Sequence, residues 1–139
     1  MPPKDKKKKG GGGGADEDQR NQKLQAILLA DSFKQNFRPI TLERPQMLLP
    51  LVNVPMMEYT VEFLAQNGVE EIFIVCVWNA DKLQEYVDSA KWSRGLKVNC
   101  IQMASCLSAG DALRELDSQG LIRSDPFVLI SGDVVSNMD

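Results

Sequence analysis

The sequence predicts an α/β domain with a three-layer, Rossmann-like architecture, in which a parallel sheet of four strands in the order 3-2-1-4 lies between helices. From residue 24 onward, short apolar runs alternate with stretches of helical spacing. This alternation favours parallel strands joined by right-handed helical crossovers. The most apolar run, at residues 72–78, lies between two helical stretches, as expected for a central strand. In a doubly wound sheet of this order, the first strand lies beside the fourth.

The first half of the chain supplies two strands and the helix between them. Residues 26–30 form a short continuous apolar run, which suits a strand covered on both faces. Pro55 favours the start of a helix, because a proline in the first turn loses no hydrogen bond. The helix should end before Gly68, a residue suited to the left-handed position that follows many helices. Its apolar stripe consists of Met57, Val61 and Leu64.

The second half of the chain continues the alternation. A helix should end near Ala90, since apolar residues recur at helical spacing before it, and residues 98–103 alternate as a strand. A further helix is expected at 109–116 and a fourth strand at 127–131. The pair Gly132-Asp133 follows this strand directly. The helix that ends near Ala90 has Leu83, Tyr86 and Val87 on one face.

The carboxyl ends of the first and fourth strands should meet at a topological switch point. In open α/β sheets, ligands bind in the crevice at this point. The loop at 31–38 and the pair Gly132-Asp133 are therefore expected to line one crevice.

The first 20 residues differ from the rest and are expected to form a disordered tail, with one domain over residues 21–139. Lysines occupy positions 4 and 6–9, glycines occupy 10–14, and acidic residues occupy 16–18. Nothing in this stretch can bury apolar surface. A solubilising role and a nuclear or nucleic-acid-binding role are both open for the lysine run.

Composition excludes several kinds of site. The chain contains no histidine, so Ser-His and Cys-His nucleophile pairs and histidine zinc ligands are ruled out. Three cysteines are too few for an all-cysteine zinc site, and we expect them to be reduced and buried in a cytosolic protein. They are Cys76, Cys100 and Cys106. No apolar run approaches the roughly 20 residues of a membrane span. The acidic domain lacks the basic stripe of a nucleic-acid reader, so its folded part should bind neither membrane nor nucleic acid.

Residues 26–50 resemble the start of sugar-1-phosphate nucleotidyltransferases. In those enzymes a strand leads into a glycine-rich loop that ends Thr-Arg-Leu-x-Pro, followed by Pro-Lys-Pro-x-Leu-Pro. The frame of that pattern is kept at Leu29, Ala30, Pro39, Pro45, Leu48, Leu49 and Pro50. The reactive positions are changed: the family's glycines are replaced by Asp31, Ser32 and Lys34, its arginine by Asn36, and its lysine by Gln46.

These five changes remove the chemistry of a phosphate cradle. Glycines let successive backbone N–H groups approach one anion, and side chains in their place obstruct that approach. Asp31 adds a negative charge, and like charges a few ångströms apart cost on the order of a few kcal/mol in a partly desolvated site. The lost arginine and lysine would have offset charge on a transferring phosphoryl group. We therefore expect no catalytic residue, and neither magnesium nor nucleotide as a cofactor.

Some residues have both a functional and a structural interpretation. By the same resemblance Asp133 matches an aspartate that holds magnesium, and it is equally a turn residue that ends a strand. Residues 108–113 resemble a turn that packs near the nucleotide base in the enzymes, and Ser108 also suits a helix cap. Trp78 and Trp92 could stack on a base or a partner, but sealing the core is the default. Cys76 has no nearby cation in sequence to make it a nucleophile.

A narrower resemblance covers residue 24 to the last residue. The chain resembles the epsilon subunits of eukaryotic translation initiation factor 2B, in which the same loop is degenerate. The matching residues are Ala30 to Phe33, Phe37 to Ile40, Arg44-Pro45, Leu48 to Leu51, Asn53-Val54, Glu58 to Thr60, Glu62 to Leu64, Lys91-Trp92, Arg123 to Asp125 and Gly132 to Val134.

This resemblance implies a subunit of the complex that exchanges GDP for GTP on initiation factor 2. In that family the exchange activity resides in a C-terminal helical-repeat domain, behind a left-handed β-helix, and neither lies in this sequence. The segment is then a non-catalytic assembly or regulatory module, whose partners are the other subunits, especially gamma, and initiation factor 2. The alternatives are an active sugar-1-phosphate nucleotidyltransferase and a nucleotide sensor without turnover.

The resemblance also implies that the domain is partial. Nucleotidyltransferase-like domains continue for roughly another hundred residues, within the upper range of single-domain sizes. We therefore expect an N-terminal fragment, in which the strand at 127–131 forms an edge of the sheet with unpaired backbone groups.

Overall fold

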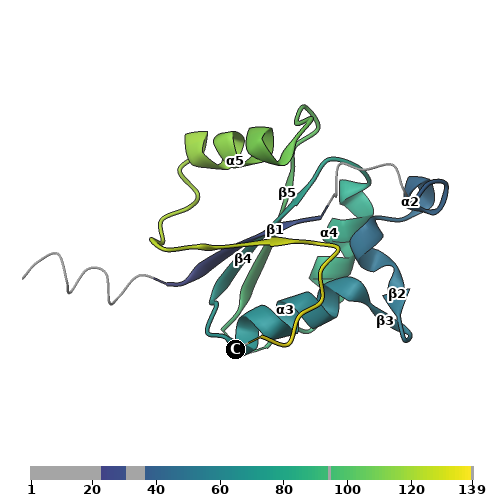
Figure 1. Ribbon diagram of the computed structural model, residues 1–139, viewed down its shortest axis with the longest axis horizontal. Coiled ribbons are helices and arrows are strands. Elements are labelled where there is room, and N and C mark those ends of the chain that lie inside the picture. The colour runs from purple at the N-terminus through teal and green to yellow at the C-terminus, as the bar shows by residue number, and fades with distance from the viewer. Residues whose placement is uncertain (1–22, 31–36, 94, 139) are drawn as a thin grey trace, which may run out of the picture.

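The computed structural model describes residues 23–30, 37–93 and 95–138. Its main sheet contains β1 (Gln25–Leu29), β4 (Glu71–Cys76), β5 (Lys97–Gln102) and β6 (Val128–Ser131). The strands lie in the order β5-β4-β1-β6, and every neighbouring pair is parallel. In chain order this is 3-2-1-4, so the predicted topology is confirmed. β6 is an outer strand of this sheet, as expected (Figure 1).

Helices cover both faces of the sheet, which gives the predicted three layers. α3 (Met56–Gln66) and α4 (Ala80–Ser89) lie on one side, and α5 (Ala109–Ser118) lies on the other (Figure 1). β1 contributes side chains to the cores on both faces of the sheet, because alternate side chains point to opposite faces of a strand. Ala26 and Leu28 pack in the core under α3 and α4, and Ile27 and Leu29 pack in the core under α5. The whole strand is buried, as its continuous apolar run predicted.

The boundaries of the predicted elements agree with the structure within a few residues, and two of them differ in detail. The strand predicted at 72–78 ends at Cys76, and Trp78 lies outside it. Pro55 does not occupy the first turn of α3; it belongs to a short strand and precedes the helix as its N-cap. Gly68 follows the C-cap Asn67 with φ +83, which confirms the predicted left-handed position.

Four short elements between β1 and α3 were not predicted. They are α2 (Ile40–Glu43), the 3₁₀ helix η1 (Gln46–Leu48), β2 (Pro50–Leu51) and β3 (Val54–Pro55). β2 and β3 form an antiparallel hairpin, and both turn residues have positive φ, Val52 at 52 and Asn53 at 66. Two-residue hairpin turns of this kind usually carry Asn-Gly or Asp-Gly, so a Val-Asn turn gave no signal in the sequence.

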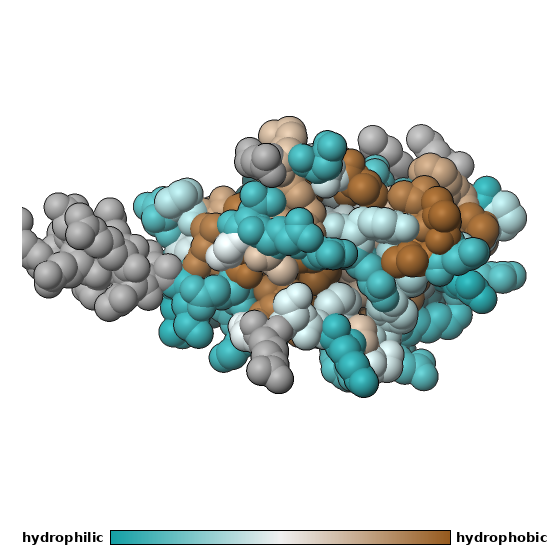
Figure 2. All heavy atoms as spheres, turned by 90° about the horizontal axis from the view of Figure 1, so that it is seen from below, coloured by the Kyte–Doolittle hydropathy of each residue, from teal (hydrophilic) through white to brown (hydrophobic). Residues whose placement is uncertain are grey.

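Apolar side chains are exposed around these short elements. Ile40 and Leu42 of α2 are exposed, as are Leu51 and Val52 of the hairpin. Figure 2 shows apolar side chains gathered at the end of the molecule where α2 and the hairpin lie. None of the helices in the described part of the chain is long and apolar enough to cross a membrane.

A buried glutamine holds the connection between α5 and β6 against β1. The side-chain amide nitrogen of Gln25 donates to Oε2 of Glu71 at 2.6 Å and to the backbone carbonyl of Leu121 at 3.3 Å. Its amide oxygen accepts from the backbone amides of Arg123 at 2.6 Å and Ser124 at 3.0 Å. Because every polar atom of this side chain is paired, its burial carries no uncompensated desolvation cost.

Candidate functional site

The candidate site lies at the carboxyl ends of β1 and β6, which are neighbours in the sheet. The amide of Gly132 donates to the carbonyl of Leu29 over 2.8 Å, so the segment after β6 lies against the end of β1. The predicted convergence of these two strand ends is confirmed. Four of the changed loop positions lie outside the described residues, namely Asp31, Ser32, Lys34 and Asn36.

Gly132 is required by packing at this edge. A Cβ atom on Gly132 would lie 2.6 Å from the carbonyl oxygen of Leu29 and 2.8 Å from both Cγ and Sδ of Met47. Met47 is fully buried, and the flexible side chain of a methionine suits such a packing position. The glycine therefore allows the end of β6, the end of β1 and η1 to meet closely. This requirement exists whether or not a ligand ever binds there.

Gln46 is described, and it is buried in η1. Its backbone carbonyl accepts from the amide of Leu49 at 3.0 Å, which closes the 3₁₀ turn. The side chain is neutral at the position where the resemblance places a lysine. A buried amide supplies no positive charge to a phosphate, so this part of the candidate site lacks the cation that phosphoryl transfer needs.

Asp133 is exposed and participates in the turn after β6. The hydroxyl of Ser131 donates to Oδ1 of Asp133 over 2.5 Å, and the amide of Val134 donates to the carbonyl of Ser131 at 3.3 Å. Within the described ranges there is no group of three or more carboxylate, cysteine or histidine residues that could hold a metal ion. Magnesium is commonly held by one or two carboxylates together with substrate phosphates and water. Asp133 as a magnesium ligand therefore stays a prediction.

The turn at residue 108 forms a helix cap. The hydroxyl of Ser108 accepts from the amide of Asp111 at 3.2 Å and donates to Oδ2 of Asp111 at 2.9 Å. The hydrogen bond from Ser108 and, more weakly, the charge of Arg114 lower the pKa of Asp111. The structural interpretation of this motif thus accounts for both side chains, with Ser108 as the N-cap of α5.

The three cysteines are free thiols, but they differ in exposure. Cys76 and Cys106 are buried, whereas Cys100 on β5 is only half-buried, contrary to expectation. The sulfur atoms of Cys76 and Cys100 lie 3.6 Å apart on adjacent strands. A hydrogen bond from Cys76 lowers the pKa of Cys100, while burial raises the pKa of Cys106.

The two tryptophans also differ. Trp78 is 70% exposed after the end of β4, so the expectation that it seals the core is wrong. Trp92 is half-buried against the core, and its indole N–H donates to the carbonyl of Val87 at 3.0 Å, which confirms the expectation there. No pattern in the sequence separated the two, since each lies at or just after the end of a predicted strand or helix.

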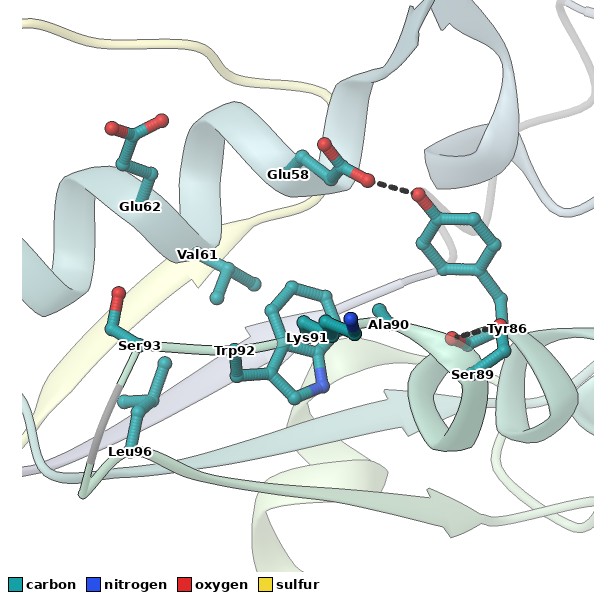
Figure 3. Close-up of a pocket in the computed structure, with 10 residues that line it drawn as sticks. All are labelled: Glu58, Val61, Glu62, Tyr86, Ser89, Ala90, Lys91, Trp92, Ser93 and Leu96. Carbon is teal, nitrogen blue, oxygen red and sulfur yellow. Dashed lines mark hydrogen bonds between the residues drawn. The ribbon is translucent and has the colours of Figure 1, made fainter.

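A pocket that the sequence did not indicate opens between α3 and the segment that leads from α4 to β5 (Figure 3). It has a volume of about 450 Å³ and carries both acidic and aromatic side chains. Its residues come from two helices and a loop, so no local motif marks it. The last of its lining residues, Leu96, directly precedes β5. That end of the pocket therefore lies toward the amino ends of the strands, away from Gly132.

A family model described as nucleotidyl transferase matches residues 25–139. The translation initiation factor eIF2B subunit epsilon of Schizosaccharomyces pombe is 53% identical over 118 residues, which cover 83% of this chain and 17% of that protein. The subunit of the same name from Dictyostelium discoideum is 51% identical over 84% of this chain and 16% of its own length. The chain thus spans about a sixth of these two relatives.

More distant similarity extends to enzymes. A putative mannose-1-phosphate guanyltransferase of Sulfolobus acidocaldarius is 30% identical over 118 residues, which cover 84% of this chain and 32% of that protein. The crystal structure of UDP-glucose pyrophosphorylase complexed with UDP-glucose superposes with a TM-score of 0.66 at 24% identity. The superposition covers 81% of this chain and 46% of that one. This match establishes the shared fold alone.

Proposed function

This chain belongs to the nucleotidyl transferase family, and from that premise we propose that it is a non-catalytic module of a translation initiation factor subunit of the eIF2B epsilon type. The observation that carries the proposal is a difference in identity. Over the same length of 118 residues, the chain is 53% identical to an epsilon subunit and 30% identical to a putative guanyltransferase. The fold is common to both groups, so the difference in identity distinguishes them where the fold does not.

The described residues of the site support a role without catalysis. Gln46 is buried and neutral, and Asp133 is exposed and accepts a hydrogen bond from Ser131. Phosphoryl transfer requires cations around the transferred group, usually with magnesium. We propose that Asp31, Ser32, Lys34 and Asn36 complete the loss, and that the protein uses neither magnesium nor nucleotide as a cofactor.

The proposed role is assembly within the complex that exchanges GDP for GTP on initiation factor 2, in the cytosol. The proposed partners are the other subunits of that complex, above all gamma, and initiation factor 2 itself. The exposed apolar side chains around α2 and the hairpin support such a role, because contiguous apolar surface commonly marks protein interfaces. Homologous domains often pair through related patches, which favours a nucleotidyltransferase-like partner such as gamma.

A segment exchange in fission yeast tests this function. The 118 matching residues of the S. pombe epsilon subunit would be replaced by those of this chain, in a strain whose own epsilon gene can be repressed. We expect growth close to that of the unmodified subunit, with gamma retained on affinity purification at about 0.3 M salt, roughly twice physiological ionic strength. Salt screens charge–charge attraction but has little effect on buried apolar contacts, so an apolar interface with gamma should persist at this salt concentration.

The matched control carries the corresponding segment of the Sulfolobus guanyltransferase, which has the same fold family and 30% identity to this chain. That chimera should neither retain gamma nor support growth. The proposal is wrong if the two chimeras behave alike, or if gamma is lost from the first one at physiological salt. A nucleotide sensor is the competing function, and titration of the protein with GTP and ATP, with and without magnesium, separates the two. Saturable binding of either nucleotide would favour the sensor.

A further inference from the structure

Two thiols form a close pair between the neighbouring strands β4 and β5. The sulfur atoms of Cys76 and Cys100 lie 3.6 Å apart, and both side chains belong to the core under α3 and α4. The sulfur of Cys76 also lies 3.8 Å from the carbonyl oxygen of Ile101, so this thiol is directed toward β5. In the sheet order β5-β4-β1-β6, the pair lies on the opposite side of β1 from β6. It is therefore separate from the candidate site, where the ends of β1 and β6 meet.

The register of the strands places this pair on a diagonal that a disulfide does not span. Cys100 is the register partner of Ile74, and Cys76 is the register partner of Gln102, so the two cysteines are offset by two residues. With strands about 4.8 Å apart and a rise of about 3.3 Å per residue, this offset separates their Cα atoms by roughly 8 Å. A disulfide needs Cα atoms within about 7 Å unless the backbone moves. A direct bond between the sulfurs would therefore require β4 or β5 to shift.

A single atom bonded to both sulfurs fits this spacing. An atom about 2.3 Å from each sulfur, the length of a zinc–thiolate bond, spans sulfurs roughly 3.3–3.8 Å apart when its bond angle is about 90–110°. The observed separation of 3.6 Å falls inside this range. Thiolates favour soft, polarisable partners. A structural zinc ion needs four ligands, and the described ranges contain no group of three or more metal-binding side chains. The pair thus suits an element that needs only two ligands from the protein.

Cys100 gives the pair its access to solvent. It is half-buried on β5, an outer strand of the described sheet, whereas Cys76 is 1% exposed. The hydrogen bond with Cys76 lowers the pKa of Cys100, although burial and the charge of Asp88 act in the opposite direction. The thiolate is the nucleophilic form of a cysteine. Cys100 should therefore react first, with the sulfur of Cys76 already close enough to form a second bond.

We propose that Cys76 and Cys100 form a dithiol site for trivalent arsenicals, soft electrophiles that bind two thiols and keep one substituent of their own. A hydrated organic arsenical carries two hydroxyl groups on arsenic. Two As–O bonds break and two As–S bonds form, and each thiol proton leaves with one hydroxyl group as water. Arsenic stays trivalent throughout, so the step needs no oxidant or reductant. The bound atom would link β4 to β5, and the inference does not depend on the proposed function.

The closeness of the two sulfurs should make binding selective for this pair. Once Cys100 has formed the first As–S bond, the second bond forms within one molecule, at a high effective concentration of the Cys76 thiol. Linked binding of this kind can exceed a single contact by about 10²–10⁴ in affinity. Monothiols such as glutathione should therefore remove arsenic from an isolated cysteine of this chain far more readily than from the pair.

Mass spectrometry of the full chain under native conditions provides the test, with phenylarsine oxide as the probe and excess glutathione as competitor. A chelate and a single-thiol adduct differ in mass by one water, because the single-thiol adduct keeps a hydroxyl group on arsenic. We expect one chelate per chain that persists in glutathione. A small dithiol such as dimercaptopropanol should remove it, since such a dithiol forms the same two As–S bonds.

Variants then identify the thiols that bind. Cys76→Ala and Cys100→Ala should each lower the affinity for phenylarsine oxide by about 100-fold or more, because either change leaves only a single-thiol adduct. Cys106→Ala is the matched control, since Cys106 is also buried but lies in the core under α5, on the other face of the sheet. It should leave the affinity unchanged. Thermal melts of all variants show whether each is folded. Cys100→Ala decides the test if Cys76→Ala does not fold, because the Cys100 side chain is only half-buried.

Three outcomes would overturn the proposal. The first is a chelate that persists in Cys100→Ala or is lost in folded Cys106→Ala, because the arsenical would then bridge a different pair of thiols. The second is the absence of a chelate with both phenylarsine oxide and the smaller probe arsenite, in protein that melts cooperatively. The third is ready closure of a Cys76–Cys100 disulfide by hydrogen peroxide while Cys106 remains a thiol. That result would show that the diagonal spacing does not prevent a direct bond between the sulfurs.

Discussion

Replacing Gly132 with alanine tests whether the glycine after β6 is retained for packing. The new Cβ would lie 2.6 Å from the carbonyl oxygen of Leu29, and this oxygen already accepts the amide of Gly132 at 2.8 Å. It would also lie 2.8 Å from two atoms of Met47, a fully buried side chain. Met47 can shift a flexible side chain, but the carbonyl of Leu29 belongs to a central strand and cannot rotate away without loss of sheet hydrogen bonds.

The expected cost follows from these contacts. Overpacking of a well-packed core costs typically 1–3 kcal/mol. Because one of the overlaps is with backbone, we expect Gly132→Ala to lower the free energy of unfolding by about 2–3 kcal/mol, at the upper part of that range. The m value should stay the same, since the surface exposed on unfolding does not change.

Urea denaturation followed by circular dichroism measures this cost, and two other glycines provide controls. Gly110→Ala meets only ordinary contact, 3.8 Å to the hydroxyl of Ser108, so it should be neutral or stabilising by up to about 1 kcal/mol. Gly120 has φ +62 and no atom within 4 Å, so alanine there should cost only the strain of a left-handed residue, about 1–2 kcal/mol. The packing argument fails if Gly132→Ala is as stable as Gly110→Ala.

Three further predictions use other parts of the molecule. Val75→Asp should abolish the cooperative melt, because Val75 is 2% exposed and a carboxylate there would be buried and unpaired; a soluble variant with a cooperative melt would contradict this. The full protein should show no pyrophosphorylase turnover above background with common sugar-1-phosphates and nucleoside triphosphates. The double change Asp31→Gly and Gln46→Lys should not restore turnover, since the enzymes' arginine is still missing. Iodoacetamide should label Cys100 before Cys106 as pH is raised, because the pKa of Cys100 is lowered and that of Cys106 is raised; mass spectrometry showing the reverse order would refute it.

The sheet and its helices could be predicted from sequence because each rests on a local pattern with one structural meaning. The continuous apolar run at 26–30 required burial on both faces, and β1 is buried throughout. Ser108 and Gly68 bounded helices through backbone geometry that few other residues satisfy. Strand order then followed from topology, since right-handed crossovers leave few arrangements.

The features that escaped prediction have no distinctive pattern in the local sequence. Whether a tryptophan is buried depends on what packs over it, and Trp92 meets the carbonyl of Val87 while Trp78 remains exposed. The hairpin turn uses Val52 at positive φ, a conformation that β-branched residues rarely adopt. The pocket brings Glu58 next to Tyr86, which is 28 positions away in the chain. No local pattern encodes such a meeting.

Retention of a motif can reflect its packing when its chemistry is gone. Gly132 resembles part of a catalytic motif, yet its missing side chain is required by the carbonyl of Leu29 and by Met47. Gln46, which precedes Met47 in the same 3₁₀ turn, is neutral at the position where the resemblance places a lysine. Residues that the fold needs should thus persist after catalysis is lost, while residues needed only by the reaction are free to change. Whether a chain of this family keeps the residues that only the reaction needs is therefore a better guide to its activity than whether it keeps the residues that the fold needs.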